Sequence, residues 1–100
     1  MIDWARIVGF QWDAGNERKN VDKHGMEQGE AEEPFFNEPL IVTKDHRHSG
    51  QEPRFHALGA TLSGRRLHIT FTLRADGKLI RVISARDMSP KERAIHAQDE

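Results

Sequence analysis

The segment from residue 66 to residue 86, RLHITFTLRADGKLIRVISAR, restricts the fold more than any other part of the chain. Apolar side chains at positions 67, 69, 71 and 73 alternate with polar ones, which is the period of a strand with one buried face. The stretch after residue 78 is rich in β-branched apolar residues and is typical of a second, largely buried strand. Between them, the pair Asp76-Gly77 favours a two-residue type I′ turn. The segment is therefore predicted to form an antiparallel hairpin.

The predicted turn also fixes which residues face each other across the hairpin. With Ala75 opposite Lys78, Leu73 comes to lie beside Ile80 on the core face. The further predicted pairs are Phe71 with Val82 and Ile69 with Ser84 on that face, and Arg74 with Leu79, Thr72 with Arg81, Thr70 with Ile83 and His68 with Ala85 on the other. Arg81 is thereby placed on the face that is not core. Arg86 is expected at the end of its strand, where its long stem reaches solvent.

The preceding predicted strand, residues 54–60, admits two registers. A two-residue turn at 63–64 would direct Phe55 to the polar face, whereas a five-residue loop over 61–65 would direct it to the core beside Phe71. We favour the loop because it buries the aromatic ring. It also gathers on one polar face Arg54, His56, His68, Arg74 and Arg81.

Local signals predict the remaining elements of the chain. Strands are expected over residues 7–12 and 40–43, with a polar loop over 44–53. Three helices are expected: one from the N-cap Asp13 to Gly25, one over 27–33 that Pro34 stops or kinks, and one from the capping box at Ser89 towards Gln98. The predicted fold class is α+β: a small antiparallel sheet with two N-terminal helices packed on it and a short C-terminal helix.

Length and composition favour one domain over residues 1–100. The chain has no cysteine. Its sequence shows neither an apolar run long enough for a membrane span nor a leader-like start, so the cytoplasm is the expected location. Residues 1–50 contain six Lys/Arg against ten Asp/Glu, and residues 51–100 contain nine against six. The basic character is thus confined to the second half, where it can serve an anionic partner, although surface arginine is also common without one.

Arginines that converge beside hydroxyls and imidazoles suit a phosphodiester. Guanidinium groups match phosphate oxygens and can stabilise the charge that develops during phosphoryl transfer. RNA supplies its own nucleophile, so a base need only remove the proton of a 2′-hydroxyl, and no metal is required. Candidates for that proton transfer are His24, His56, His68 and Glu52. A solvated polar face without chemistry is the alternative.

Other site types receive little support from the sequence. The run Asp45-His46-Arg47-His48 offers three metal-ligating side chains in a loop, but no cysteine completes a thiolate site, so neither metal nor cofactor is expected. Gly59 and Gly64 lack the spacing of a P-loop or a dinucleotide-binding loop.

The chain from about Phe10 to His96 resembles the BrnT family of toxins from type II toxin–antitoxin systems. The resemblance lies in the segments FQWDAGNERKNVDKHG (10–25), EAEEPFFNEPL (30–40), EPRFHALG (52–59), ITFTLR (69–74) and IRVISARDMSPKER (80–93). It implies a small fold related to the RelE toxins and RNA cleavage that arrests translation. It also implies a ribbon-helix-helix antitoxin, BrnA, that neutralises the toxin and joins it in repressing their operon.

Matched position by position, the family pattern points to residues that largely agree with the sheet geometry: Lys23, His24, Glu52, Arg54, Arg74, Arg81 and Arg86. Together with His56 and Lys19, they make up the predicted site. Its candidate catalytic residues are Glu52, Arg54, His56, Arg74 and Arg81, and its candidate RNA-binding residues are Lys19, Lys23, His24 and Arg86. Two positions depart from the pattern. Pro34 replaces an apolar residue before the double phenylalanine, and His96 replaces a tyrosine in a chain that has no tyrosine.

Three functions follow as hypotheses. The first is a metal-independent endoribonuclease toxin. The second is a non-catalytic interaction protein that acts through the antitoxin complex, and thereby on operator DNA. The third is a general RNA-binding module, which the net charge of −1 disfavours. For the toxin we expect an antitoxin segment that covers the arginines with its carboxylates or lies across the sheet edge.

Overall fold

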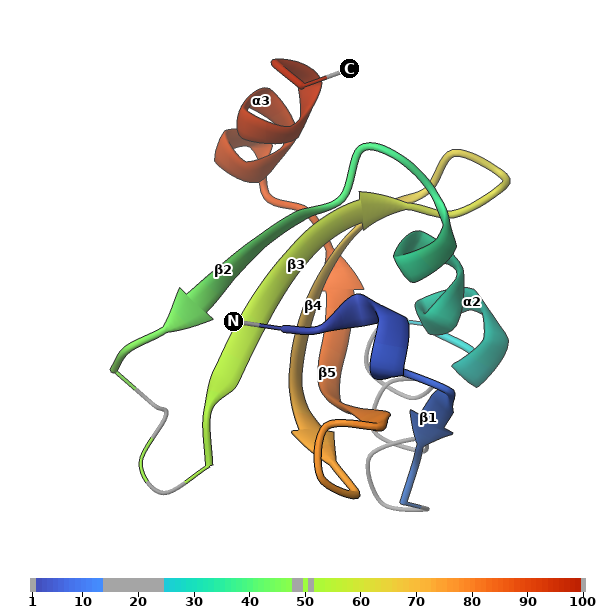
Figure 1. Ribbon diagram of the computed structural model, residues 1–100. Coiled ribbons are helices and arrows are strands. Elements are labelled where there is room, and N and C mark those ends of the chain that lie inside the picture. Colours follow the sequence, from blue (N-terminus) through green and yellow to red (C-terminus); the bar gives the residue numbers. More distant parts are fainter. Residues whose placement is uncertain (1, 14–24, 48–49, 51, 100) are drawn as a thin grey trace.

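The computed structural model describes residues 2–13, 25–47, 50 and 52–99 (Figure 1). Its elements, in which η marks a 3₁₀ helix, are η1 (Trp4–Arg6), β1 (Gly9–Gln11), α2 (Gln28–Glu32), η2 (Glu33–Phe36), β2 (Ile41–Asp45), β3 (Arg54–Ala60), β4 (Arg66–Arg74), β5 (Leu79–Asp87) and α3 (Pro90–Ala97). The helix predicted between Asp13 and Gly25 lies mostly outside the described residues. The fold is α+β, and no helix in the described ranges is long and apolar enough to cross a membrane.

The five strands form one sheet in the order β1-β5-β4-β3-β2. The four strands from β2 to β5 are antiparallel to their neighbours, as predicted, but β1 runs parallel to β5 with Phe10 opposite Ile80. The sheet is therefore mixed, and the prediction of a purely antiparallel sheet is wrong. Hairpin signals identify only partners that are close in sequence, whereas most of the chain separates β1 from β5.

The β4–β5 hairpin has the predicted register next to its turn and a different one further along. Asp76 and Gly77 both have positive φ, as a type I′ turn requires, and Ala75 does too. Beyond the pair of Phe71 with Val82, one extra residue enters β5. The observed pairs are then Thr70 with Ser84, Ile69 with Ala85 and His68 with Arg86, so the three predicted pairs in this part are wrong by one residue.

The irregularity is a β-bulge at Ile83, and burial explains it. Val82 and Ala85 are both completely buried, yet strict alternation cannot place residues three apart on the same face. One unpaired residue between them restores both to the core. As a consequence, Arg86 moves onto the polar face opposite His68.

The register of β3 agrees with the five-residue loop over 61–65. Arg54 lies opposite Thr72, and Phe55 opposite Phe71. Strand β2 extends to Asp45, two residues beyond the predicted end, and Asp45 lies opposite Arg54. The first residues of the predicted loop are therefore strand, because the regular pairing with β3 continues through them.

The core lies between the sheet and the layer formed by η1, α2 and η2 (Figure 1). Phe71 is completely buried at its centre, with ring centroids 5.1 Å from Phe35 and 5.4 Å from Phe55. Pro34, which was predicted to stop or kink the second helix, is the second residue of η2, directly after the end of α2, and packs on Gly59. A Cβ atom on Gly59 would lie 2.8 Å from the Cβ of Pro34, so the glycine allows this close approach.

Candidate active site

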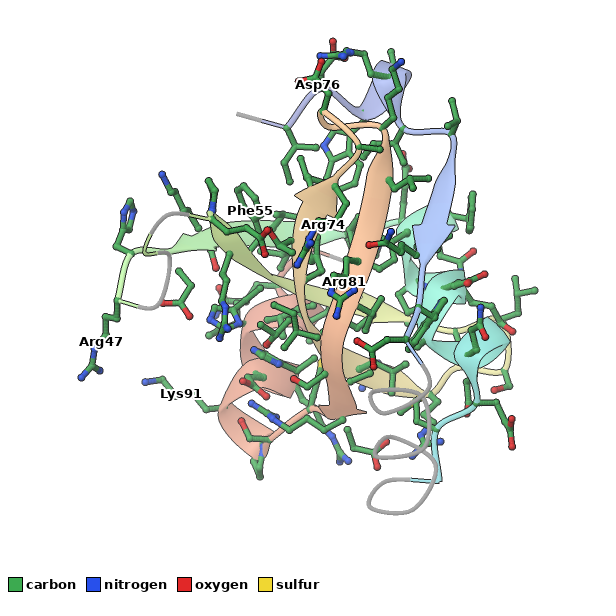
Figure 2. All side chains as sticks on the ribbon, turned by 90° about the horizontal axis from the view of Figure 1, so that it is seen from below. Arg47, Phe55, Arg74, Asp76, Arg81 and Lys91 are labelled. Carbon is green, nitrogen blue, oxygen red and sulfur yellow. The ribbon has the colours of Figure 1, made fainter. Side chains whose placement is uncertain are left out.

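The sheet face opposite the core carries the predicted arginines and histidines. Its side chains come from alternate positions of β3, β4 and β5, and they include Arg54, His56, His68, Arg74 and Arg81. Figure 2 shows Arg74 and Arg81 on the same side of β4 and β5. We call this set, together with Arg86, the arginine face. Helix α3 borders it, since Glu92 of α3 contacts both His68 and Arg86.

Arg81 is held by two side chains of the first part of the chain. Its Nη2 donates to a carboxylate oxygen of Asp13, and its Nη1 lies 3.5 Å from the amide oxygen of Gln11. The parallel pairing of β1 with β5 places Gln11 directly opposite Arg81. About a quarter of the Arg81 side chain remains exposed, so a ligand can reach the guanidinium.

Arg74 forms an ion pair with Glu52 near the start of β3. Nε of Arg74 lies 3.1 Å from Oε2 of Glu52, and Nη2 lies 3.2 Å from Oε1. Both side chains are more than one third exposed. Exposed pairs of this kind contribute about 0–1 kcal/mol to stability, so an incoming phosphate can replace the carboxylate at little cost.

His56 lies in a chain of three polar side chains. Its Nε2 donates to Oδ2 of Asp45 at 3.0 Å, because a carboxylate only accepts. Its Nδ1 lies 3.1 Å from the hydroxyl oxygen of Thr70. Asp45 is almost completely buried and accepts a second bond, from the backbone N–H of Arg47. The carboxylate thus fixes the orientation of the imidazole, and Nδ1 faces a hydroxyl group.

His68 stacks beside His56, with ring centroids 4.9 Å apart. Burial, helped by the charge of nearby Arg86, lowers the pKa of His68 below its ordinary value of 6.5. The ring is therefore neutral at pH 7. Its Nδ1 atom is buried and has no hydrogen-bond partner among the described residues, so substrate cannot reach that atom without a rearrangement of the face.

Arg86 is bound to α3 rather than directed freely into solvent. Its two Nη atoms donate to the carboxylate of Glu92 at 2.8 and 3.0 Å. The same carboxylate accepts from the backbone N–H of Ser89, and the hydroxyl of Ser89 accepts from the N–H of Glu92. The predicted capping box is therefore confirmed, and its Glu92 also anchors Arg86.

This arrangement predicts an acid-sensitive contribution to stability. Hydrogen bonds from Arg86, with help from Ser89 and His68, lower the pKa of Glu92 from 4.5 to about 2. A carboxyl group whose pKa is lowered by folding stabilises the fold above its unfolded pKa and loses this effect as pH falls through the folded one. We expect Glu92→Gln, which keeps a capping side chain, to cost about 1–2 kcal/mol at pH 7 because the charged pair is partly solvated.

Urea unfolding of the native chain and of Glu92→Gln at pH 7, 4 and 2.5 measures this contribution. The difference in unfolding free energy should shrink steadily below pH 4.5. A difference that is independent of pH would show that the charge of Glu92 contributes nothing.

Some of the predicted site residues lie outside the described residues, and some residues of the observed site were not predicted. Lys19, Lys23 and His24 lie outside the described residues, so their predicted role in RNA binding remains a prediction. Three carboxylates were missed as partners of the arginine face: Asp13, predicted only as an N-cap; Asp45, weighed only as a metal ligand; and Glu92, predicted only as a cap. A longer β2 in register with β3 would have revealed Asp45, but the polar run after Thr43 concealed the strand end.

No group of three or more metal-ligating side chains is found among the described residues.

His96 stands where the family pattern has a tyrosine. It is completely buried, and its Nε2 donates to the carbonyl oxygen of Pro39 at 2.9 Å. His96 is therefore a buried residue of α3 that ties this helix to the segment before β2.

Fold and face together define a class: a small α+β domain whose mixed sheet presents arginines and histidines on one side, an arrangement suited to a phosphate-containing ligand. A family model described as "Ribonuclease toxin, BrnT, of type II toxin-antitoxin system" matches residues 12–92. The chain therefore belongs to the BrnT family of ribonuclease toxins.

Structural comparison agrees with this family at the level of the fold. The 1.1 Å crystal structure of the Brucella abortus ribonuclease toxin BrnT is similar, with a TM-score of 0.65 and 22% sequence identity. The match covers 82% of this chain and 97% of that one. No significant match was found among curated proteins. Membership of a type II system implies an RNA substrate and an antitoxin partner.

Proposed function

We propose that the chain is an endoribonuclease that cleaves RNA at the arginine face without a metal ion and thereby arrests translation in the cytoplasm. The observation that carries this proposal is the convergence of accessible guanidinium groups with an oriented imidazole: Arg81 and Arg74 stand on the same face as His56, whose ring Asp45 holds. Guanidinium groups supply the charge stabilisation and the imidazole supplies the base, which are the two requirements of the reaction.

The substrate phosphate replaces the carboxylates that now occupy the guanidinium groups. Arg81 and Arg74 exchange Asp13 and Glu52 for two phosphate oxygens, and Arg54, one strand away on the same face, adds a third positive charge. Arg86 keeps its bond to Glu92 and holds α3 at the border of the face.

The chemical step uses the RNA's own 2′-hydroxyl. Nδ1 of His56 takes the hydroxyl proton after the hydroxyl of Thr70 turns aside, and the 2′-oxygen attacks the adjacent phosphorus. The bond from phosphorus to the 5′-oxygen breaks, and that oxygen takes a proton from water. The products are a 2′,3′-cyclic phosphate and a 5′-hydroxyl, and the arginines stabilise the negative charge in the transition state.

The proposed partner is a ribbon-helix-helix antitoxin similar to BrnA. It neutralises the toxin, and the complex represses the operon through contacts that the antitoxin makes with operator DNA. Because such DNA-binding folds are dimers, the complex is expected to be a higher-order assembly.

Chelation tests the proposed chemistry. Purified toxin should cleave bulk RNA equally well with and without excess EDTA, because the proposed charge stabilisation comes from guanidinium groups. Cleavage is followed by gel electrophoresis over time. Activity that disappears on chelation and returns with a divalent ion would refute metal independence and direct attention to the run from Asp45 to His48.

A further inference from the structure

A set of large apolar side chains is exposed on the opposite side of the molecule from the arginine face. Trp4 is 43% exposed, and Val8 and Phe36 are each 78% exposed. They belong to η1, to the approach to β1 and to the end of η2, which lie together on the helical layer (Figure 1). We call these three residues and the hollows around them the Trp4 surface. Single exposed apolar residues are ordinary, whereas a contiguous set marks an interaction site.

Three hollows surround Trp4. One of about 390 Å³ lies beside Val8 and Phe36, a second of about 870 Å³ lies between Phe36 and Leu40, and a third of about 500 Å³ reaches Phe55 on the sheet. All three share Trp4 as a lining residue. An aromatic side chain between adjoining hollows is the usual centre of a protein–protein interface, since partner side chains fill the hollows around it.

The edge of the Trp4 surface is acidic. Glu32, Glu38 and Asp99 line the two hollows next to Phe36, and no lysine or arginine does so among the described residues. Among the described residues, Lys44 is the one basic residue that lines the third hollow. A complementary partner therefore carries an apolar stripe flanked by Lys or Arg side chains.

The arginine face is the alternative docking site for a protein. Arg81, Arg74 and Arg86 hold carboxylates of their own chain, and antitoxin carboxylates would have to displace Asp13, Glu52 and Glu92, as the RNA phosphate does. Docking on the Trp4 surface instead buries apolar side chains that are exposed in the isolated toxin.

We propose that the antitoxin docks on the Trp4 surface through an amphipathic helix, whose apolar side chains enter the three hollows and whose basic side chains lie against Glu32, Glu38 and Asp99. Such a helix would extend the layer of η1, α2 and η2 towards β2 and β3, where Val42 and Phe55 line the third hollow. This inference rests on the proposed function in needing a protein antitoxin, but it does not depend on the cleavage mechanism.

The test uses the full-length toxin and the protein encoded by the adjacent reading frame. Val8→Ser and Phe36→Ser, singly and together, remove exposed side chains, so they should fold as the native chain does. We expect the double variant to bind the antitoxin about 10- to 100-fold more weakly in calorimetry, as for an interface centre. It should remain toxic without antitoxin and escape rescue by it. Leu62→Ser, equally exposed on the β3–β4 loop, is the matched control and should bind normally.

Glu38→Gln tests the charge complementarity. It should weaken binding and make the association rate less sensitive to salt. Native affinity in the double variant would overturn the proposal, as would loss of binding in Arg81→Ala alone, which would place the antitoxin on the arginine face. A dimer of the isolated toxin that Phe36→Ser dissociates would assign the surface to a second copy. A native toxin that cleaves no RNA, yet loses its antitoxin in the double variant, would refute the proposed function and leave the docking surface supported.

Discussion

Arg81→Ala should lower the rate of RNA cleavage by about 100- to 1,000-fold, the usual effect of losing one donor that stabilises a transition state. The fold should survive, because Arg81 lies on the sheet face opposite the core and its partly exposed pair with Asp13 contributes about 0–1 kcal/mol. Cleavage of a labelled RNA under single-turnover conditions measures the rate, and thermal unfolding followed by circular dichroism checks the fold.

Two further variants isolate the chemistry of this change. Arg81→Lys keeps the charge but loses the planar fork of donors, so it should have an intermediate rate. Arg6→Ala also removes an arginine from an exposed ion pair, with Asp76 at the hairpin turn, and should cleave at the native rate. A fully active, folded Arg81→Ala variant would show that the arginine face is not where RNA is cut.

Phe71→Ala should destabilise the domain by about 3–5 kcal/mol, which is a large part of the stability of a domain of this size. The Phe71 ring is completely buried between Phe35 and Phe55. Its removal leaves a cavity, because the surrounding side chains relax only partially into the space. Urea or thermal unfolding measures the loss, and each kcal/mol lowers Tm by about 4–8 °C at this length.

Phe36→Ala is the matched control for this prediction. It makes the same chemical change at a side chain that is mostly exposed, so its effect on stability should be small. Equal losses in the two variants would contradict the assignment of Phe71 to the centre of the core.

The parts of the fold that the sequence predicted well are those that local pattern determines. Alternating residues and the Asp76-Gly77 turn determined the start of the β4–β5 hairpin, and the need to bury Phe55 selected the five-residue loop before β4. The capping box of α3 follows from Ser89, Pro90 and Glu92 alone. In each case the partners lie close together along the chain or share one simple pattern of burial.

The remaining features depend on contacts between distant segments. The bulge at Ile83 is needed because Val82 and Ala85 both face the core, and the parallel partner of β1 is β5, which is distant in the sequence. The carboxylates of Asp13 and Asp45 approach Arg81 and His56 through those same long-range pairings. The residue types of the site could thus be predicted from the sequence, whereas their ion pairs could not.

The chemistry of the cleaved ends tests the central claim most directly. The toxin is incubated with a short labelled RNA of defined sequence and with the same RNA carrying 2′-O-methyl groups, and the products are identified by mass spectrometry. The account predicts a 2′,3′-cyclic phosphate and a 5′-hydroxyl from the first RNA and no cleavage of the second, because His56 must take a proton from the 2′-hydroxyl. A 3′-hydroxyl with a 5′-phosphate, or cleavage of the methylated RNA, would contradict it.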